Sequence, residues 1–158
     1  MPQQLPTLHL ADWEPTRDTL HQYARILGRL RGRYMPKSKH WWHITLGVSA
    51  RGITTGPFPV SSQTLELTLD LITHQLVIDS SDGWSATLPL AGQTAAGLCN
   101  RISATLAAAG VELEPDLLSA FDGGESLPYA ALLSGASPHE RLLDYLQTLQ
   151  AHGAKLMR

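Results

Sequence analysis

The chain has 158 residues, the size of one ordinary domain, and its 43% hydrophobic content is enough for one continuous core. No stretch approaches the roughly 18 apolar residues of a membrane-spanning helix, and the first residues lack a signal-peptide pattern, so we expect a cytoplasmic protein without a membrane partner. Residues 1–60 carry eight basic and three acidic side chains, although the net charge is only -2. This part should attract an anion, unless it pairs with the acidic remainder of the chain, which would explain the asymmetry equally well.

The N-terminal third of the sequence predicts an arm and a helix. Residues 1–15 are interpreted as an extended arm that covers part of the core. From Thr16, a suitable N-cap, apolar residues recur at helical spacing as far as Pro36, which predicts a helix over residues 16–35. The opposite face of this helix carries three arginines at the same spacing: Arg25, Arg29 and Arg33.

The hydrophobic period changes to two at His40, which predicts the first strand of a β-meander over residues 40–90. Trp42, Ile44, Leu46 and Val48 alternate there with more polar positions. Three further strands are predicted from alternation and turn residues, over 64–72, 75–80 and 84–90. Asp82-Gly83 favours a two-residue turn between the last two strands, because both positions tolerate a positive φ.

The remaining sequence predicts more helix than strand. We expect a helix over 93–109, a short strand over 111–118, a flexible glycine-rich loop over 119–137 and a C-terminal helix over 138–152. Strands bracketed by helices are typical of the α+β class. We therefore predict a single domain over residues 1–158, with a mostly antiparallel sheet of four to six strands and helices packed on one face.

The stretch HWWH, residues 40–43, is the main candidate for a site. On a regular strand its two histidines face opposite ways, which disfavours a shared metal ion. His43 would lie beside Thr45 on the polar face, where it could donate or accept a hydrogen bond near neutral pH. A histidine that is merely hydrogen-bonded beneath a covering helix is the alternative. Trp41 could stack on a ligand, or it could anchor a core or an interface.

Other motifs exclude several classes of site. His43-Ile44-Thr45-Leu46 matches the His-x-Thr signature of two-histidine phosphoesterases, but no second histidine is followed two positions later by Ser or Thr. No metal-ligand cluster, phosphate-binding glycine motif or Gly-x-Ser-x-Gly elbow occurs, so we predict no metal and no cofactor. Basic and aromatic residues around 25–42 would suit single-stranded nucleic acid, but a pI near 6.4 argues against that partner.

Several blocks of the sequence resemble an uncharacterised bacterial family, a domain of unknown function. They are LHLADWEPTRDTLHQYARILGRLR, HWWHITLGVSARGITTGPFP, TLELTLDLITHQLVIDSSDG and the helix that follows. The resemblance covers residues 5 to about 115, and its pattern is HWWH(I/V)TL, ARG(I/L)TTGP and SDG. Members often run longer, so this chain resembles a short version that lacks their C-terminal half. The resemblance implies no activity.

The matching blocks suggest a pocket for a small anionic ligand near the HWWHIT stretch. We expect His43 and Thr45 on a strand, Arg51 at its end, His21 on the covering helix and Trp41 beside them. Arg51 would hold the anionic group, and His43 would donate a hydrogen bond or, if there is a reaction, transfer a proton. The alternative is a non-catalytic interaction module, such as a homo-oligomer, with the tryptophans and the basic helix at its interface. A concave site would favour the ligand, and a flat apolar patch at Trp41 would favour the partner.

Overall fold

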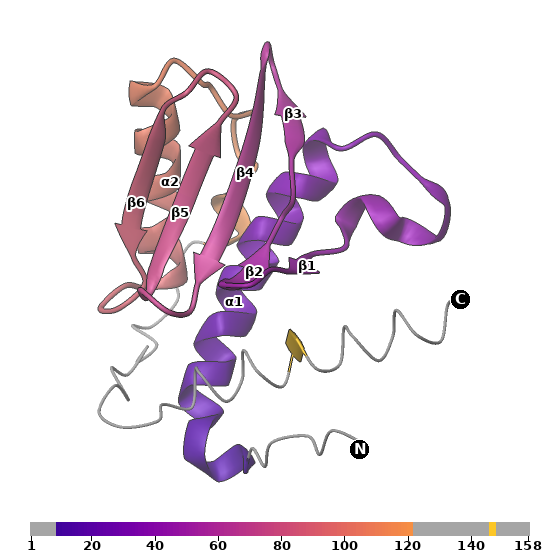
Figure 1. The fold of residues 1–158 in the computed structure, drawn as a ribbon. Coiled ribbons are helices and arrows are strands. Elements are labelled where there is room, and N and C mark those ends of the chain that lie inside the picture. Colours follow the sequence, from indigo (N-terminus) through magenta and orange to yellow (C-terminus); the bar gives the residue numbers. More distant parts are fainter. Residues whose placement is uncertain (1–8, 122–145, 148–158) are drawn as a thin grey trace.

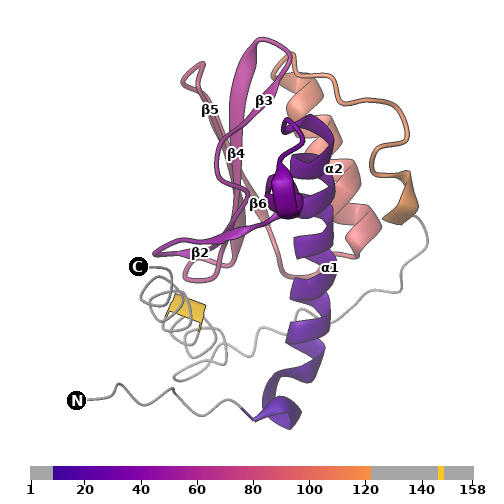
Figure 2. The ribbon, with the colours of Figure 1, turned by 90° about the vertical axis from the view of Figure 1, so that its right-hand side faces the viewer.

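The computed structural model describes residues 9–121 and 146–147 (Figure 1). In this part of the chain, a six-stranded antiparallel sheet carries two α-helices, α1 (Leu10–Tyr34) and α2 (Ala95–Ala108). Figure 2 shows both helices on the same side of the sheet. The predicted α+β class, with helices on one face of an antiparallel sheet, is therefore confirmed.

The sheet has six strands, and two short ones, β2 and β3, pair with the same edge of the long strand β4. The strands are β1 (Gly47–Val48), β2 (Gly52–Thr54), β3 (Phe58–Val60), β4 (Gln63–Asp70), β5 (Gln75–Ser80) and β6 (Ser85–Pro89). Their order is β1-β2-β4-β5-β6, and β3 also pairs with β4. Gly52 of β2 lies opposite Asp70 at the end of β4, and Phe58 of β3 lies opposite Leu65 near its start. Strands β4, β5 and β6 agree within two residues with the predicted bounds.

The core lies between the sheet and the two helices. Leu65, Leu67 and Leu69 alternate along β4 and are at most 1% exposed. The helices meet this face with buried residues at helical spacing: Leu20, Tyr23, Ile26, Leu27 and Leu30 from α1, and Leu98, Ile102 and Leu106 from α2. A period of two in the strand and of 3.6 in the helices thus places all of these apolar side chains in one layer.

Helix α1 begins at Leu10, so residues 10–15 are helical and do not belong to the predicted arm. The helix was predicted to begin at Thr16 because threonine is a suitable N-cap. The structure continues the helix through Pro15, and a proline inside a helix loses one backbone hydrogen bond. Trp13 packs against the core, which compensates for that loss. The hydroxyl of Thr19 donates to the Pro15 carbonyl oxygen at 2.9 Å, and Thr16, the predicted N-cap, lies inside the helix.

The predicted strand at residues 40–50 is largely replaced by a 3-10 helix, η1 (Lys39–Ile44), and only β1 remains extended and paired. His40 and Trp41 have left-handed backbones, with φ of 56° and 60°, which break the alternation of a strand. The faces are also reversed: His43 is 6% exposed, whereas Trp42 is 62% exposed. Packing of η1 against α1 decides this segment, although its residues alternate as in a strand.

The hairpin between β5 and β6 has a three-residue loop where a two-residue turn was predicted. Ser80 N–H donates to Trp84 O at 3.1 Å, and Gly83 N–H donates to Ser80 O at 3.0 Å. Gly83 has a φ of 86°, whereas Asp82 is not among the residues with positive φ. A type I turn followed by a left-handed glycine satisfies both bonds, so only one of the two positions needs that freedom.

No strand forms over 111–118. Val111 and Leu113 belong to no helix or strand and pack against the core, and Pro115, which lacks a backbone donor, lies in a turn that is followed by η2 (Ser119–Phe121). The rest of the loop predicted at 119–137, and the predicted helix 138–152 apart from residues 146–147, lie outside the described residues. Neither α1 nor α2 combines the length and apolar composition needed to cross a bilayer.

Candidate functional site

A cavity of about 480 Å³ lies between α1 and η1. We call it the α1–η1 pocket. Its lining comes from α1, from the segment that leads into η1, from η1 itself and from one residue after α2: Gly28, Arg29, Gly32, Arg33, Lys37, Trp41, His43, Ile44 and Leu117. Apolar walls with a few charged groups are the usual composition of a small-molecule site, and this volume lies in the usual range.

Two glycines of α1 allow η1 to pack closely against the helix. Gly28 and Gly32 are four residues apart and therefore lie on the same face of α1. A Cβ at Gly32 would lie 2.9 Å from Ile44 Cγ2, whereas a Cβ at Gly28 would have no neighbour closer than 4.0 Å. The glycines thus form the floor of the pocket, and Ile44 packs directly over Gly32.

His43 is buried at the wall of this pocket. The backbone N–H of Ser38 donates to its Nδ1 atom at 3.3 Å. Because Nδ1 accepts this bond, the neutral ring carries its proton on Nε2. The Trp41 ring stacks on His43, with the centroids 5.7 Å apart and the planes inclined by 26°. These contacts fix the orientation of both rings.

Trp41 is 69% exposed and stands on a strained backbone. Two consecutive left-handed residues without glycine cost about 1–2 kcal/mol each. Burial of the indole in the core does not compensate for this cost, because most of the ring is exposed. Backbone strain of this kind is concentrated at ligand-binding and catalytic sites, so it marks η1 as a functional candidate.

Three cationic side chains give the pocket a positive charge. Arg33 makes a bidentate contact with Glu114, with Nε and Nη2 each 2.6 Å from a carboxylate oxygen. The hydrogen bond to Glu114 raises the pKa of Arg33 above its ordinary value. Arg29 and Lys37 are exposed and form no ion pair with any residue that the structure describes. These two cations are therefore available to a ligand.

The structure brings together two of the five predicted site residues. Trp41 and His43 line the pocket, whereas His21, Thr45 and Arg51 do not. His21 is exposed on α1, seven residues before Gly28 and about 10 Å away along the helix axis. The Thr45 hydroxyl is exposed and lies 3.5 Å from the Trp41 carbonyl oxygen.

Arg51 lies in the turn between β1 and β2, where it binds a carboxylate of this chain. Its Nε donates to Asp70 Oδ2 at 2.6 Å. Asp70 is 3% exposed, and its Oδ1 also accepts from the backbone N–H groups of Ile72 and Thr73. Burial raises the pKa of Asp70, but the hydrogen bonds from Thr73, Arg51 and Ile72 together lower it below its ordinary value. The guanidinium predicted to hold an anionic ligand thus stabilises the end of β4.

Sequence reasoning missed most of the pocket residues. Arg29 and Arg33 were noted only as a basic face, and the glycines were not considered. Gly28 and Gly32 did carry a signal, because each glycine inside a helix costs about 1 kcal/mol relative to alanine and often marks close packing. Two of them at i and i+4, beside arginines, indicate a segment packed over that face.

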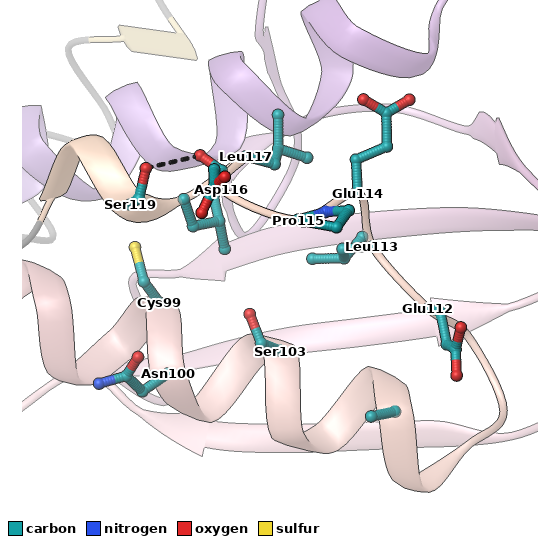
Figure 3. Close-up of a pocket in the computed structure, with 12 residues that line it drawn as sticks. Cys99, Asn100, Ser103, Glu112, Leu113, Glu114, Pro115, Asp116, Leu117 and Ser119 are labelled. Carbon is teal, nitrogen blue, oxygen red and sulfur yellow. Dashed lines mark hydrogen bonds between the residues drawn. The ribbon is translucent and has the colours of Figure 1, made fainter.

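A second cavity, of about 450 Å³, lies between α2 and residues 112–119 (Figure 3). Cys99 and Ser103 point from α2 toward this segment, whereas the carboxylate of Glu114 points away from α2 and binds Arg33 of α1. The Ser119 hydroxyl donates to the Asp116 carbonyl oxygen at 2.8 Å, which holds the segment in its turn. Among residues 9–121 and 146–147, no three His, Cys, Asp or Glu side chains are grouped so that they could hold a metal ion. The α1–η1 pocket is therefore the stronger candidate.

Comparison with known protein families places most of the chain in one of them. A family model described as a family of unknown function, DUF5996, matches residues 5–120. No curated protein and no solved structure matches the chain. The matched residues include every residue that lines the α1–η1 pocket.

Proposed function

We propose that this chain, which belongs to the family of unknown function DUF5996, binds a small organic anion in the α1–η1 pocket. The observation that carries the proposal is the combination, in one cavity, of apolar walls with Arg29 and Lys37, two cations without a carboxylate partner in the described chain. Apolar walls favour a carbon skeleton, and the guanidinium of Arg29 suits a carboxylate or phosphate group.

The proposal is one of binding, without a reaction. Among the described residues that line the pocket there is no carboxylate, hydroxyl or thiol that could act as a nucleophile or as a second acid–base group beside His43. Nδ1 of His43 already accepts from Ser38 N–H. His43 is therefore assigned two roles: it supports the Trp41 ring, and its Nε2–H is a hydrogen-bond donor.

The exposure of η1 favours a second candidate function. Trp41, Trp42 and Ile44 are 69%, 62% and 44% exposed, so three large apolar side chains of one short segment leave much of their surface uncovered. Exposed apolar side chains that lie together mark protein interfaces as well as ligand sites. A homo-oligomer that uses this surface is therefore the alternative to a ligand-binding protein.

The test is calorimetric titration of the purified full-length chain with 2-naphthoate, an organic anion with an apolar body. We expect binding to the wild type, and we expect Arg29→Gln combined with Lys37→Gln to weaken it roughly tenfold, because the carboxylate loses two exposed charge contacts. Arg101→Gln is the matched control, since Arg101 is exposed on α2 and does not line the pocket. This control should bind as the wild type does, and binding should weaken with added salt.

Two results would contradict this proposal. The first is equal weakening by Arg101→Gln, which would indicate a general charge effect. The second is no binding of 2-naphthoate to the wild type. If, in addition, light scattering shows a dimer of the 17.2 kDa chain that Trp42→Ser dissociates, the interaction module replaces the ligand site.

A further inference from the structure

We infer that the ligand of the α1–η1 pocket is a planar aromatic acid whose ring lies against Trp41. This inference rests on the proposed function and narrows its ligand class. Three features of the pocket support it: the presentation of the Trp41 ring, the open helix backbone at Gly28 and the cations that line the same cavity.

Trp41 is held in place although its ring contributes little to the core. Its backbone is left-handed, its indole is 69% exposed, and the ring contributes to the lining of the pocket. The near-parallel His43 ring fixes its orientation from one side. An oriented and largely exposed indole is a surface on which another aromatic ring can stack, with offset geometry and centroids about 4.5–7 Å apart.

The floor of the pocket has the shape that a flat ring requires. Gly28 and Gly32 place no side chain on this face of α1. Ile44 covers Gly32, but the helix backbone stays open at Gly28, where an added Cβ would have no neighbour closer than 4.0 Å. Ile44 and Leu117 add apolar walls beside Gly28. A planar ring can lie on such a floor, whereas a thicker saturated skeleton makes poorer contact with it.

The cations of the pocket favour an aromatic ring for a second reason. Arg29 and Lys37 line the same cavity as Trp41. They can pair with the acidic group of the ligand, and a cation near the face of an aromatic ring also gains attraction from its quadrupole. A saturated ring of the same size offers the carboxylate contact without this attraction.

The experiment compares 2-naphthoate with decahydro-2-naphthoate on the wild-type chain by calorimetric titration. The two acids have the same charge and the same arrangement of ring carbons, and the saturated acid is at least as apolar, so burial alone would not favour 2-naphthoate. We expect 2-naphthoate to bind roughly three- to tenfold more tightly. Trp41→Leu should remove the part of this preference that comes from stacking and so reduce it clearly, and Trp41→Phe should keep most of it. Trp42→Leu is the matched control, because Trp42 is exposed in η1 but does not line the pocket.

Each outcome separates the two proposals. Equal affinity of the wild type for the two acids, or a preference that Trp41→Leu leaves unchanged, would overturn the aromatic ligand class and leave anion binding in place. Failure of both acids to bind would overturn the inference together with the proposed function. The comparison between the acids is made on the wild type, so it does not depend on how the variants fold.

Discussion

His40 and Trp41 adopt left-handed backbone conformations that non-glycine residues rarely hold, with φ and ψ of 56° and 27° at His40 and of 60° and 21° at Trp41. The two conformations turn the chain after Ser38, so that His43 points inward while Trp41 and Trp42 remain exposed. The cost is about 1–2 kcal/mol per residue, and it falls on the segment that forms one wall of the pocket. The ring contacts of Trp41 and the burial of His43 are what maintain this geometry.

Replacing His40 by glycine should therefore stabilise the protein. Relief of the left-handed strain should outweigh the larger unfolded-state entropy of glycine, for a net gain of about 0.5–1 kcal/mol. Urea unfolding of His40→Gly measures this change. Lys39→Gly is the control, because Lys39 is exposed in the same 3-10 helix and has no positive φ, so glycine there should destabilise. Equal destabilisation by the two substitutions would show that position 40 stores no strain.

The residue scale also explains why sequence reasoning failed at this segment. Trp42, Ile44, Leu46 and Val48 alternate as in a strand, and Trp41 is not a residue type that predicts a left-handed turn. The reason for the turn lies at Gly32 of α1, where Ile44, 12 residues later in the sequence, packs. His43 was identified as a candidate because of its residue type, and its burial could not be read from a local pattern.

Close packing of η1 on α1 is the element-scale interaction that creates the pocket. It depends on the missing side chain at Gly32, since a Cβ there would meet Ile44 Cγ2 at 2.9 Å. That methyl group belongs to a β-branched residue with a stiff χ1, so it cannot easily move aside. Gly28 lies one turn away on the same face, where its nearest neighbour would be the Ile44 carbonyl oxygen at 4.0 Å.

Alanine substitutions at Gly28 and Gly32 should therefore change the stability of the protein in opposite directions. Gly28→Ala should stabilise by about 0.5–1 kcal/mol through helix propensity alone, because the added methyl group meets no close neighbour. Gly32→Ala gains the same propensity but must displace Ile44, and we expect a net loss of about 1 kcal/mol. Thermal and urea unfolding measure both changes. Ile44→Ala should rescue Gly32→Ala in a double-mutant cycle, and the absence of coupling would contradict the packing.

Helices and strands that depend on local signals could be predicted from the sequence, but the contacts between residues far apart in the chain could not. β4 shows strict alternation of leucines, and α2 begins at an N-cap, Thr94, whose hydroxyl accepts from Gly97 N–H at 2.8 Å. Both elements were predicted within two residues of their ends. Arg51 shows the limit: as a polar residue in a matching block it suggested a ligand clamp, but its partner is Asp70, which lies 19 residues later in the chain.

At the scale of the whole molecule, Tyr23 joins three elements. It lies on α1 and is fully buried. Its hydroxyl is 2.9 Å from the carbonyl oxygen of Leu90, the residue after β6, and 3.0 Å from that of Gln93, which lies just before α2. The helix that forms the floor of the pocket is thereby fixed to the chain segment that connects the sheet to the second helix. Removal of the hydroxyl leaves buried carbonyl groups without this donor.

Tyr23→Phe should destabilise the protein by about 1–3 kcal/mol at neutral pH, because buried acceptors lose their partner. Burial raises the pKa of Tyr23 to about 12, whereas the unfolded chain releases this proton near the ordinary value of 10.0. The hydroxyl therefore makes its full contribution to the free energy of unfolding below pH 10, and this contribution is lost as the pH rises toward 12. Urea unfolding at pH 8 and at pH 11.5 should show the difference between wild type and variant shrinking with pH. Other groups titrate in both proteins and cancel, so a constant difference would mean that the phenol keeps an ordinary pKa in the folded chain.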